Sequence, residues 1–90
     1  EGRDAVMPFI DIVWDMSGEE AGNVDHIADN GLTREDVRHA FDNVYRHTVS
    51  KSSGNPAIFG WTEAGELIFV TYERIDDETV YPVTAYRIER

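Results

Sequence analysis

The sequence predicts an α+β fold in the order β-α-α-β-β-β, with two helices packed on one face of an antiparallel sheet. Two helix-capping patterns lie close together in the first half of the chain. After Pro56 the apolar residues change from helical spacing to alternation, which indicates strands. The chain has 90 residues, of which 41% are hydrophobic, so residues 1–90 are expected to form a single domain.

The first strand is expected at Phe9–Trp14, where aromatic and β-branched residues follow Pro8. A helix is expected next, because Ser17 can cap its start and Glu20, three positions later, can complete a capping box. Asn30-Gly31 favours the left-handed conformation that ends a helix. The apolar residues of this helix keep helical spacing, and they are Ala21, Val24, Ile27 and Ala28.

The second helix is expected to begin after Thr33, which caps it, with Asp36 at the third helical position. Leu32 and Val37 occupy the two positions of a hydrophobic staple. The stretch His26–Thr33 is therefore interpreted as a joint between two helices. The second helix is expected to carry one apolar stripe, formed by Val37, Ala40, Phe41 and Val44.

The second half of the chain is expected to hold one loop and three strands. Residues 47–56 have the composition of a loop, and strands are expected at 57–63, 67–74 and 79–88. Gly65 allows a hairpin between the first two of these strands. Pro82 has no backbone donor, so the last strand is expected to lie at an edge or to carry a bulge there.

The charge is unusually negative, with 18 acidic and 8 basic residues and a formal net charge of −10. Such a surface repels phosphate backbones at long range, which disfavours general nucleic-acid binding. From Asn43 to Thr62, however, there is no Asp or Glu, while Arg46, His47 and Lys51 all fall in this window. Any anion site is expected there.

The chain has no cysteine, which excludes disulfides and thiolate metal sites and suits a reducing cytosol. No apolar run approaches the roughly 20 residues that span a bilayer. A cytoplasmic protein without a membrane partner is therefore expected. His26, His39 and the acidic run at 76–78 lack the ligand spacing of zinc or calcium sites, so no metal or cofactor is expected and His39 is assigned to a solvated helix face.

Several segments together resemble the BrnT-like toxins, which are RelE-superfamily ribonucleases of type II toxin-antitoxin systems. The resemblance rests on a strand ending in Trp14-Asp15, a helix that closes on Asn30-Gly31, and a G-x-T-x-x-G-x-L pattern. That pattern is formed by Gly60, Thr62, Gly65 and Leu67. The chain has Asp29-Asn30-Gly31 where the family often has Lys-His-Gly, and Thr84-Ala85-Tyr86-Arg87 where the family has Ser-Ala-Arg-Arg. The resemblance implies a toxin-like fold and a cognate antitoxin partner.

RNA cleavage without a metal needs a base, cations for the phosphate and an acid for the leaving oxygen. In RelE-type sites these groups are Arg, Lys, Tyr and sometimes His or Glu, so the resemblance implies a catalytic set here. Tyr72 and Tyr86 are the tyrosines of that set, although cross-strand packing is the simpler role for both. Phe59 and Trp61 could stack a base, but alternate strand residues of that size are usually core. The expected catalytic residues are Arg46, His47, Lys51, Arg74 and Arg87, although a surface contact with the acidic turn is the simpler role for Arg74 and Arg87. The first three are expected beside Arg74 or Arg87 at one end of the sheet, where they would form a cationic pocket.

Two functions are consistent with the sequence. The first is a BrnT-like toxin that cleaves RNA or has lost that ability, and the second is a non-catalytic, acidic protein-binding module that keeps the toxin fold. The expected partner of the first is an antitoxin, with RNA binding opposed by the net charge, and a homo-oligomer is the further alternative. The acid-free window favours the first function, whereas the net charge of −10 favours the second.

Overall fold

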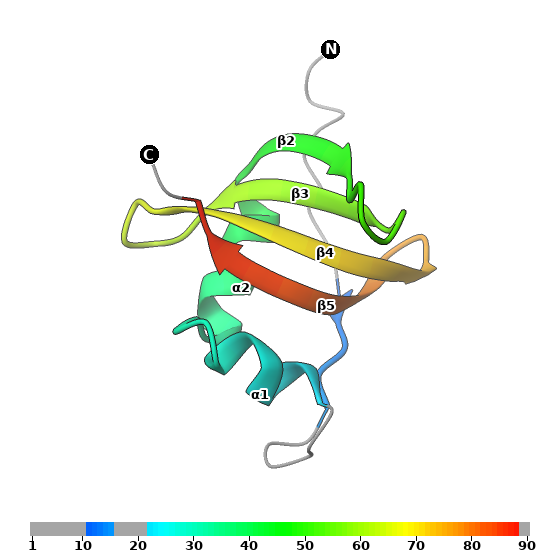
Figure 1. Ribbon diagram of the computed structural model, residues 1–90, viewed down its shortest axis with the longest axis horizontal. Helices are drawn as coiled ribbons and strands as arrows, with labels where there is room; N and C mark the ends of the chain where they lie inside the picture. Colours follow the sequence, from blue (N-terminus) through cyan, green and yellow to red (C-terminus); the bar gives the residue numbers. More distant parts are fainter. Residues whose placement is uncertain (1–10, 16–21, 89–90) are drawn as a thin grey trace.

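The computed structural model describes residues 11–15 and 22–88, which form two helices and a five-stranded sheet (Figure 1). The sheet has the strand order β1-β5-β4-β3-β2, and both helices lie on the same side of it (Figure 1). The fold class is therefore confirmed as α+β. The elements are β1 (Asp11–Ile12), α1 (Asn23–Ala28), α2 (Arg34–Asp42), β2 (Val44–Val49), β3 (Pro56–Trp61), β4 (Leu67–Asp76) and β5 (Thr79–Arg87).

The joint between the helices has the predicted conformation. Gly31 has a φ of 78°, and its N–H donates to the Ala28 carbonyl at 2.9 Å. The Leu32 N–H donates to the Ile27 carbonyl at 3.2 Å, which completes the Schellman pattern of helix ends. At the other end, α1 begins at Asn23 after Gly22, which is extended. The predicted cap at Ser17 and Glu20 lies outside the described residues.

The start of α2 also follows the sequence. Thr33 Oγ1 accepts from the Asp36 N–H, and the Asp36 carboxylate accepts from the Thr33 N–H, so the capping box is complete. Leu32 and Val37, the predicted staple residues, are both buried.

The end of α2 differs from the prediction, because the helix stops at Asp42 and Val44 begins β2. Asn43, with φ −135° and ψ 61°, leaves the helical region. Val44–Val49 contains β-branched and aromatic residues, and it pairs in antiparallel fashion with β3. The predicted loop at 47–56 is therefore shortened to residues 50–55.

β3, β4 and β5 form the predicted antiparallel meander. The register shifts between Thr71 and Tyr72, beside Pro82, which confirms the predicted bulge. β1 differs from the prediction because it pairs with β5 in parallel, so the sheet is mixed. β1 is placed there by two backbone bonds, from Asp11 N to Glu78 O at 2.6 Å and from Val13 N to Val80 O at 2.9 Å.

The hydrophobic core lies between the helices and the sheet. α2 packs on β3 and β4, whereas α1 packs on β5. At Gly60 an added Cβ would lie 2.4 Å from the Ala40 carbonyl oxygen, so glycine is required for this close approach of α2. The buried core residues include Ile27, Leu32, Val37, Phe41, Ile58, Ile68, Val70, Tyr72 and Val80.

Candidate functional site

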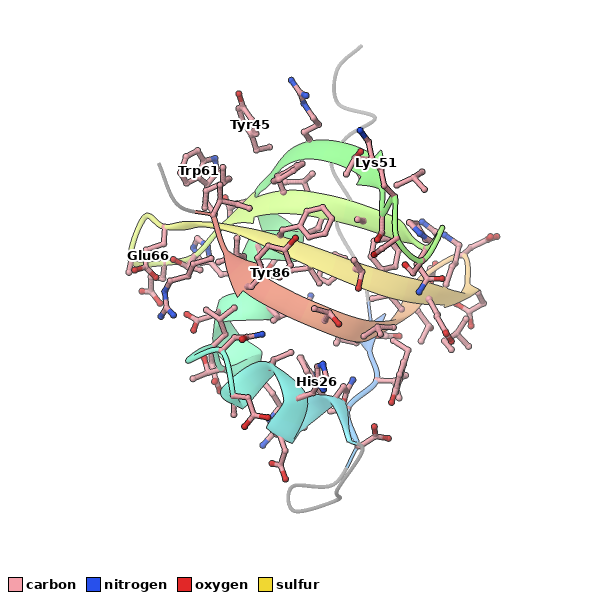
Figure 2. The ribbon with its side chains drawn as sticks, viewed as in Figure 1. His26, Tyr45, Lys51, Trp61, Glu66 and Tyr86 are labelled. Carbon is pink, nitrogen blue, oxygen red and sulfur yellow. The ribbon has the colours of Figure 1, made fainter. Side chains whose placement is uncertain are left out.

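The face of the sheet opposite the helices carries a row of aromatic side chains. Ile58, Ile68 and Val70 point into the core, so the alternate residues of β3 and β4 point to the other face. Phe59, Phe69 and Tyr86 are consecutive cross-strand partners there, with ring centroids 5.0 Å and 5.3 Å apart. The neighbouring pair Tyr45 and Trp61 meets edge to face at 6.0 Å. We call Tyr45, Phe59, Trp61, Phe69 and Tyr86 the aromatic row. Figure 2 labels Tyr45, Trp61 and Tyr86 of this row.

The aromatic row is partly exposed to solvent. Tyr45 is 60% exposed and Tyr86 is 43% exposed, while Phe59, Trp61 and Phe69 are half-buried. Neither helix of the described chain covers this face (Figure 1). Partly exposed rings on an uncovered sheet offer flat apolar surfaces for stacking or docking.

A polar hollow of about 160 Å³ adjoins the aromatic row. Phe69 and Tyr86 form part of its wall, and the loop 50–55 closes one side. Ser50 and Thr71 are almost fully buried there, at 7% and 6% exposure. Its hydroxyl groups come from Ser50, Ser52, Ser53, Thr71, Thr84 and Tyr86, and Asn55 adds an amide.

The acidic residues of the described chain are concentrated away from this region. Those of the helices and their joint are Asp25, Asp29, Glu35, Asp36 and Asp42. Asp11 and Asp15 lie in and after β1, and Glu63 and Glu66 lie in the hairpin that joins β3 to β4. Glu73 lies within β4, and Asp76, Asp77 and Glu78 lie at the β4–β5 turn. The acid-free window, residues 43–62, forms β2, the loop 50–55 and β3. These elements make up one half of the open face.

Three of the predicted catalytic residues share one edge of the sheet. Arg46 and His47 are exposed on β2. Arg46 pairs with Phe59 and lies on the open face, whereas His47 pairs with the core residue Ile58 and projects to the helix side. Lys51 is exposed in the loop that follows β2 (Figure 2). Arg46 therefore stands next to the aromatic row in the sheet, and Lys51 lies between two serines of the polar hollow in the sequence.

Arg87 lies elsewhere. Its guanidinium donates to the carbonyls of Asn30 and Gly31 at 3.0 and 3.1 Å, and to the Glu66 carboxylate at 2.9 Å. Figure 2 shows Glu66 and Lys51 at opposite ends of the sheet. β5 is separated from β2 by two strands, so Arg87 does not join Arg46, His47 and Lys51 in the predicted cationic pocket.

Arg74 is also engaged by main-chain oxygens. Its guanidinium donates to the carbonyls of Asp76 and Asp77 at 3.4 and 3.1 Å, within the acidic β4–β5 turn. Arg74 therefore has the simpler of its two expected roles, a surface contact with the acidic turn. Tyr72 is 3% exposed and meets Phe41 edge to face at 5.3 Å, so it belongs to the core.

The histidines of the helices have different surroundings. His39 Nδ1 lies 2.7 Å from the Trp61 carbonyl oxygen, so this nitrogen carries the proton and donates it. The assignment of His39 to a solvated helix face is therefore wrong, because its ring links α2 to β3. His26 is exposed and lines a second hollow of about 250 Å³ together with Asn23, Tyr81 and Val83.

Asp15 and Asn23 join the chain after β1 to the start of α1. The Asp15 N–H donates to Asn23 Oδ1 at 2.9 Å, and the Asn23 N–H donates to Asp15 Oδ2 at 3.0 Å. The Tyr81 hydroxyl donates to the same carboxylate oxygen at 2.5 Å. These bonds, that of Tyr81 foremost, hold the pKa of Asp15 below its ordinary value. The Trp14-Asp15 pair of the toxin resemblance thus has a structural role.

The glycine pattern of that resemblance is structural as well. Gly60 admits α2, and Thr62 Oγ1 accepts from the Glu66 N–H at 3.1 Å inside the hairpin. Gly65 has a φ of 86° and closes the turn. These motif residues therefore stabilise the fold, and the candidate site is formed by other residues.

Sequence reasoning missed the open face as a site. Phe59 and Trp61 were assigned to the core because alternation of large apolar residues does not distinguish a covered face from an open one. The type of apolar side chain distinguishes the two faces in the sequence. Ile58, Ile68 and Val70 on the covered face are aliphatic, whereas Phe59, Trp61 and Phe69 on the open face are aromatic.

The chain is a small α+β protein in which two helices pack on a five-stranded mixed sheet. No family model matches it, and neither the curated proteins nor the solved structures contain a match. Within the residues that the structure describes, no helix is long and apolar enough to cross a membrane.

Proposed function

We propose that the chain is a BrnT-like, RNA-directed toxin that holds single-stranded RNA on the open face of its sheet. The observation that carries this proposal is the aromatic row, which lies beside an acid-free edge on a chain with a net charge of −10. Aromatic side chains on a sheet stack unpaired bases, and nearby cations meet the phosphates.

The spacing of the rings suits successive bases. Phe59 and Trp61 are two residues apart on β3, which corresponds to about 6.6 Å along a strand. The cross-strand ring distances of 5.0 and 5.3 Å continue the surface over β4 and β5. A strand of RNA could therefore cross the sheet with its phosphates along the β2 edge, toward Arg46 and Lys51.

Cleavage at this surface would follow the metal-free route. A base takes the proton of the 2′-hydroxyl, the resulting oxygen attacks the adjacent phosphorus, and an acid protonates the departing 5′-oxygen. Histidine is the side chain best suited to proton transfer near neutral pH, but His47 pairs with Ile58 and projects away from the open face, so it is assigned no role in cleavage there. Arg46 and Lys51 would stabilise the charge of the phosphate. The function requires access to cytoplasmic RNA, and regulation by an antitoxin is part of the proposal.

The test is RNA binding and cleavage by the parent protein and two matched variants. The first variant, Arg46→Ala/Lys51→Ala, removes two cations from the site. The control, Arg34→Ala/Arg38→Ala, removes two cations from α2 on the other face. Fluorescence anisotropy at low salt measures binding of a labelled mixed-sequence RNA, and a denaturing gel detects cleavage.

The parent and the control are expected to bind RNA weakly, and the site variant is expected to lose binding, because long-range repulsion leaves only short-range contacts to hold the ligand. Cleavage, where the parent shows it, should disappear in Arg46→Ala/Lys51→Ala and persist in His47→Ala, whose side chain projects to the helix side of β2. If the parent binds no RNA at low salt, the RNA-directed function is wrong.

The second candidate is the non-catalytic protein-binding module. Its support is that β2 is a sheet edge with exposed apolar side chains, Tyr45 at 60% and Val49 at 59%. An extended partner segment could add to this edge as a further strand. Absence of RNA binding, together with a partner peptide that raises the melting temperature of the parent, would favour this function.

A further inference from the structure

The polar hollow beside the loop 50–55 has a composition suited to one kind of ligand. Its apolar wall is made by Val83 and by two rings of the aromatic row, Phe69 and Tyr86, which are 5.3 Å apart and inclined at 42°. Its remaining wall is rich in hydroxyls and includes the Asn55 amide. Among the described residues that line it, none carries a charge. A neutral, flat group with both donors and acceptors fits these surroundings.

The loop that bears these polar groups is fixed by its own hydrogen bonds. The Ser50 N–H donates to the Asn55 carbonyl, and the Gly54 N–H donates to the Ser50 carbonyl, both at 2.8 Å. Gly54 has a φ of 79°, which allows this tight closure. Ser50 Oγ and Ser52 Oγ are 3.3 Å apart, and the Asn55 N–H donates to Ser53 Oγ at 3.3 Å. The hydroxyls are therefore held in position before a ligand arrives.

The size of the hollow limits the ligand further. Its volume of about 160 Å³ is well below the ~300–1,000 Å³ of pockets that take drug-sized molecules. A single six-membered ring suits it better than a fused bicyclic ring. Nucleobases splayed from single-stranded RNA are recognised by stacking on an aromatic ring and by hydrogen bonds to their polar edges.

We infer that this hollow is a pyrimidine subsite, which takes one base of the bound RNA against Phe69 and Tyr86 and reads its edge with Asn55 and the surrounding hydroxyls. The inference rests on the proposed RNA function and adds a base preference to it. Lys51, between Ser50 and Ser52 in the loop, is the cation that would meet the phosphate of the same nucleotide. Direct readout at this position predicts discrimination by base type, whereas stacking on the aromatic row is tolerant of sequence.

The experiment compares oligo(U), oligo(C) and oligo(A) of equal length, with anisotropy as the readout. The site variant is Asn55→Ala/Thr84→Val, which removes an amide and a hydroxyl from the hollow. The control is Thr48→Val on β2, which removes a hydroxyl outside it. A melting curve establishes that each variant is folded.

The parent and the Thr48→Val control should bind at least one pyrimidine oligomer about fivefold more tightly than oligo(A), as expected for one or two hydrogen bonds to a base. In the site variant the ratio should fall to about 1 while oligo(A) binding is retained. RNA binding without a pyrimidine preference, or with a preference unchanged in the site variant, would overturn the subsite and leave the proposed function standing. Failure of the parent to bind all three oligomers would overturn both.

Discussion

The two faces of the sheet are both apolar, yet they differ in the kind of side chain that they present. On the covered face Ile58, Ile68 and Val70 are completely buried under the helices. On the open face the rings of Phe69 and Tyr86 are partly exposed and share the surface with hydroxyl groups. Aliphatic side chains offer only packing, whereas rings with polar neighbours can also bind a flat ligand. The covered face thus stabilises the fold, and the open face is the one on which we propose recognition.

Charge separates the helices from the β2 edge of the sheet. The surfaces of α1 and α2 carry acidic residues, whereas β2 and the loop 50–55 carry Arg46, His47 and Lys51 with no carboxylate between them. The net charge of −10 is therefore a poor description of the β2 edge. An anion would be repelled at a distance and attracted only where it reaches that edge.

Truncation of one side chain on each face tests the comparison most strongly. Ile68→Ala should lower the free energy of unfolding by ~2–5 kcal/mol, because it leaves a cavity in the core. Tyr86→Ala should cost about 1 kcal/mol or less, since its ring is 43% exposed, and it should weaken RNA binding. Urea denaturation measures both values. Equal losses of stability would show that the open face is part of the core.

A smaller effect is expected from the glycine under α2. Gly60→Ala should cost about 1–3 kcal/mol, because its methyl group would meet the Ala40 carbonyl oxygen and the helix would have to move away. Gly54→Ala is the control. Its Cβ would meet nothing within 4 Å, so only the positive φ opposes it, at about 1 kcal/mol. If the two variants are equally stable in urea, the close approach of α2 to β3 is not a constraint on the covered face.

The smallest effect concerns acid stability. The pKa of Asp15 is lowered from 3.8 by the bonds from Tyr81 and Asn23, so its ionised form stabilises the fold. That contribution is complete above the ordinary pKa and is lost as the pH falls through the lowered folded-state pKa. Asp15→Asn should therefore lower the melting temperature at pH 7 and flatten its decline below about pH 4. Asp29→Asn, at the exposed end of α1, should leave the acid decline unchanged.

The parts of the fold that depend on local chemistry could be predicted from the sequence. The capping box at Thr33 and the left-handed Gly31 need only neighbouring residues, and both are present. β2 was not predicted, because Val44 continues the apolar spacing of α2 and only pairing with β3 favours the strand. The parallel position of β1 depends in the same way on a distant partner, β5.

The candidate site was predictable only in part, for a related reason. The acid-free window identified the edge that holds Arg46, His47 and Lys51, since these residues are close in the sequence. The role of Arg87 could not be predicted, because an arginine is equally able to bind a phosphate or a row of carbonyl oxygens. The carbonyls that engage Arg87 belong to a joint 56 and 57 positions earlier in the chain.

The bonds between α1 and β5 have a consequence for synthesis on the ribosome. α1 has six residues, too few for a stable isolated helix. Asn23 Nδ2 donates to the Pro82 carbonyl 59 positions later, and Asn30 Nδ2 donates to the Ala85 carbonyl 55 positions later. Arg87, on the same strand, donates a hydrogen bond to the Asn30 carbonyl. The first described helix is therefore completed only by the last described strand, so this fold reaches its native state only after β5 has emerged from the ribosome.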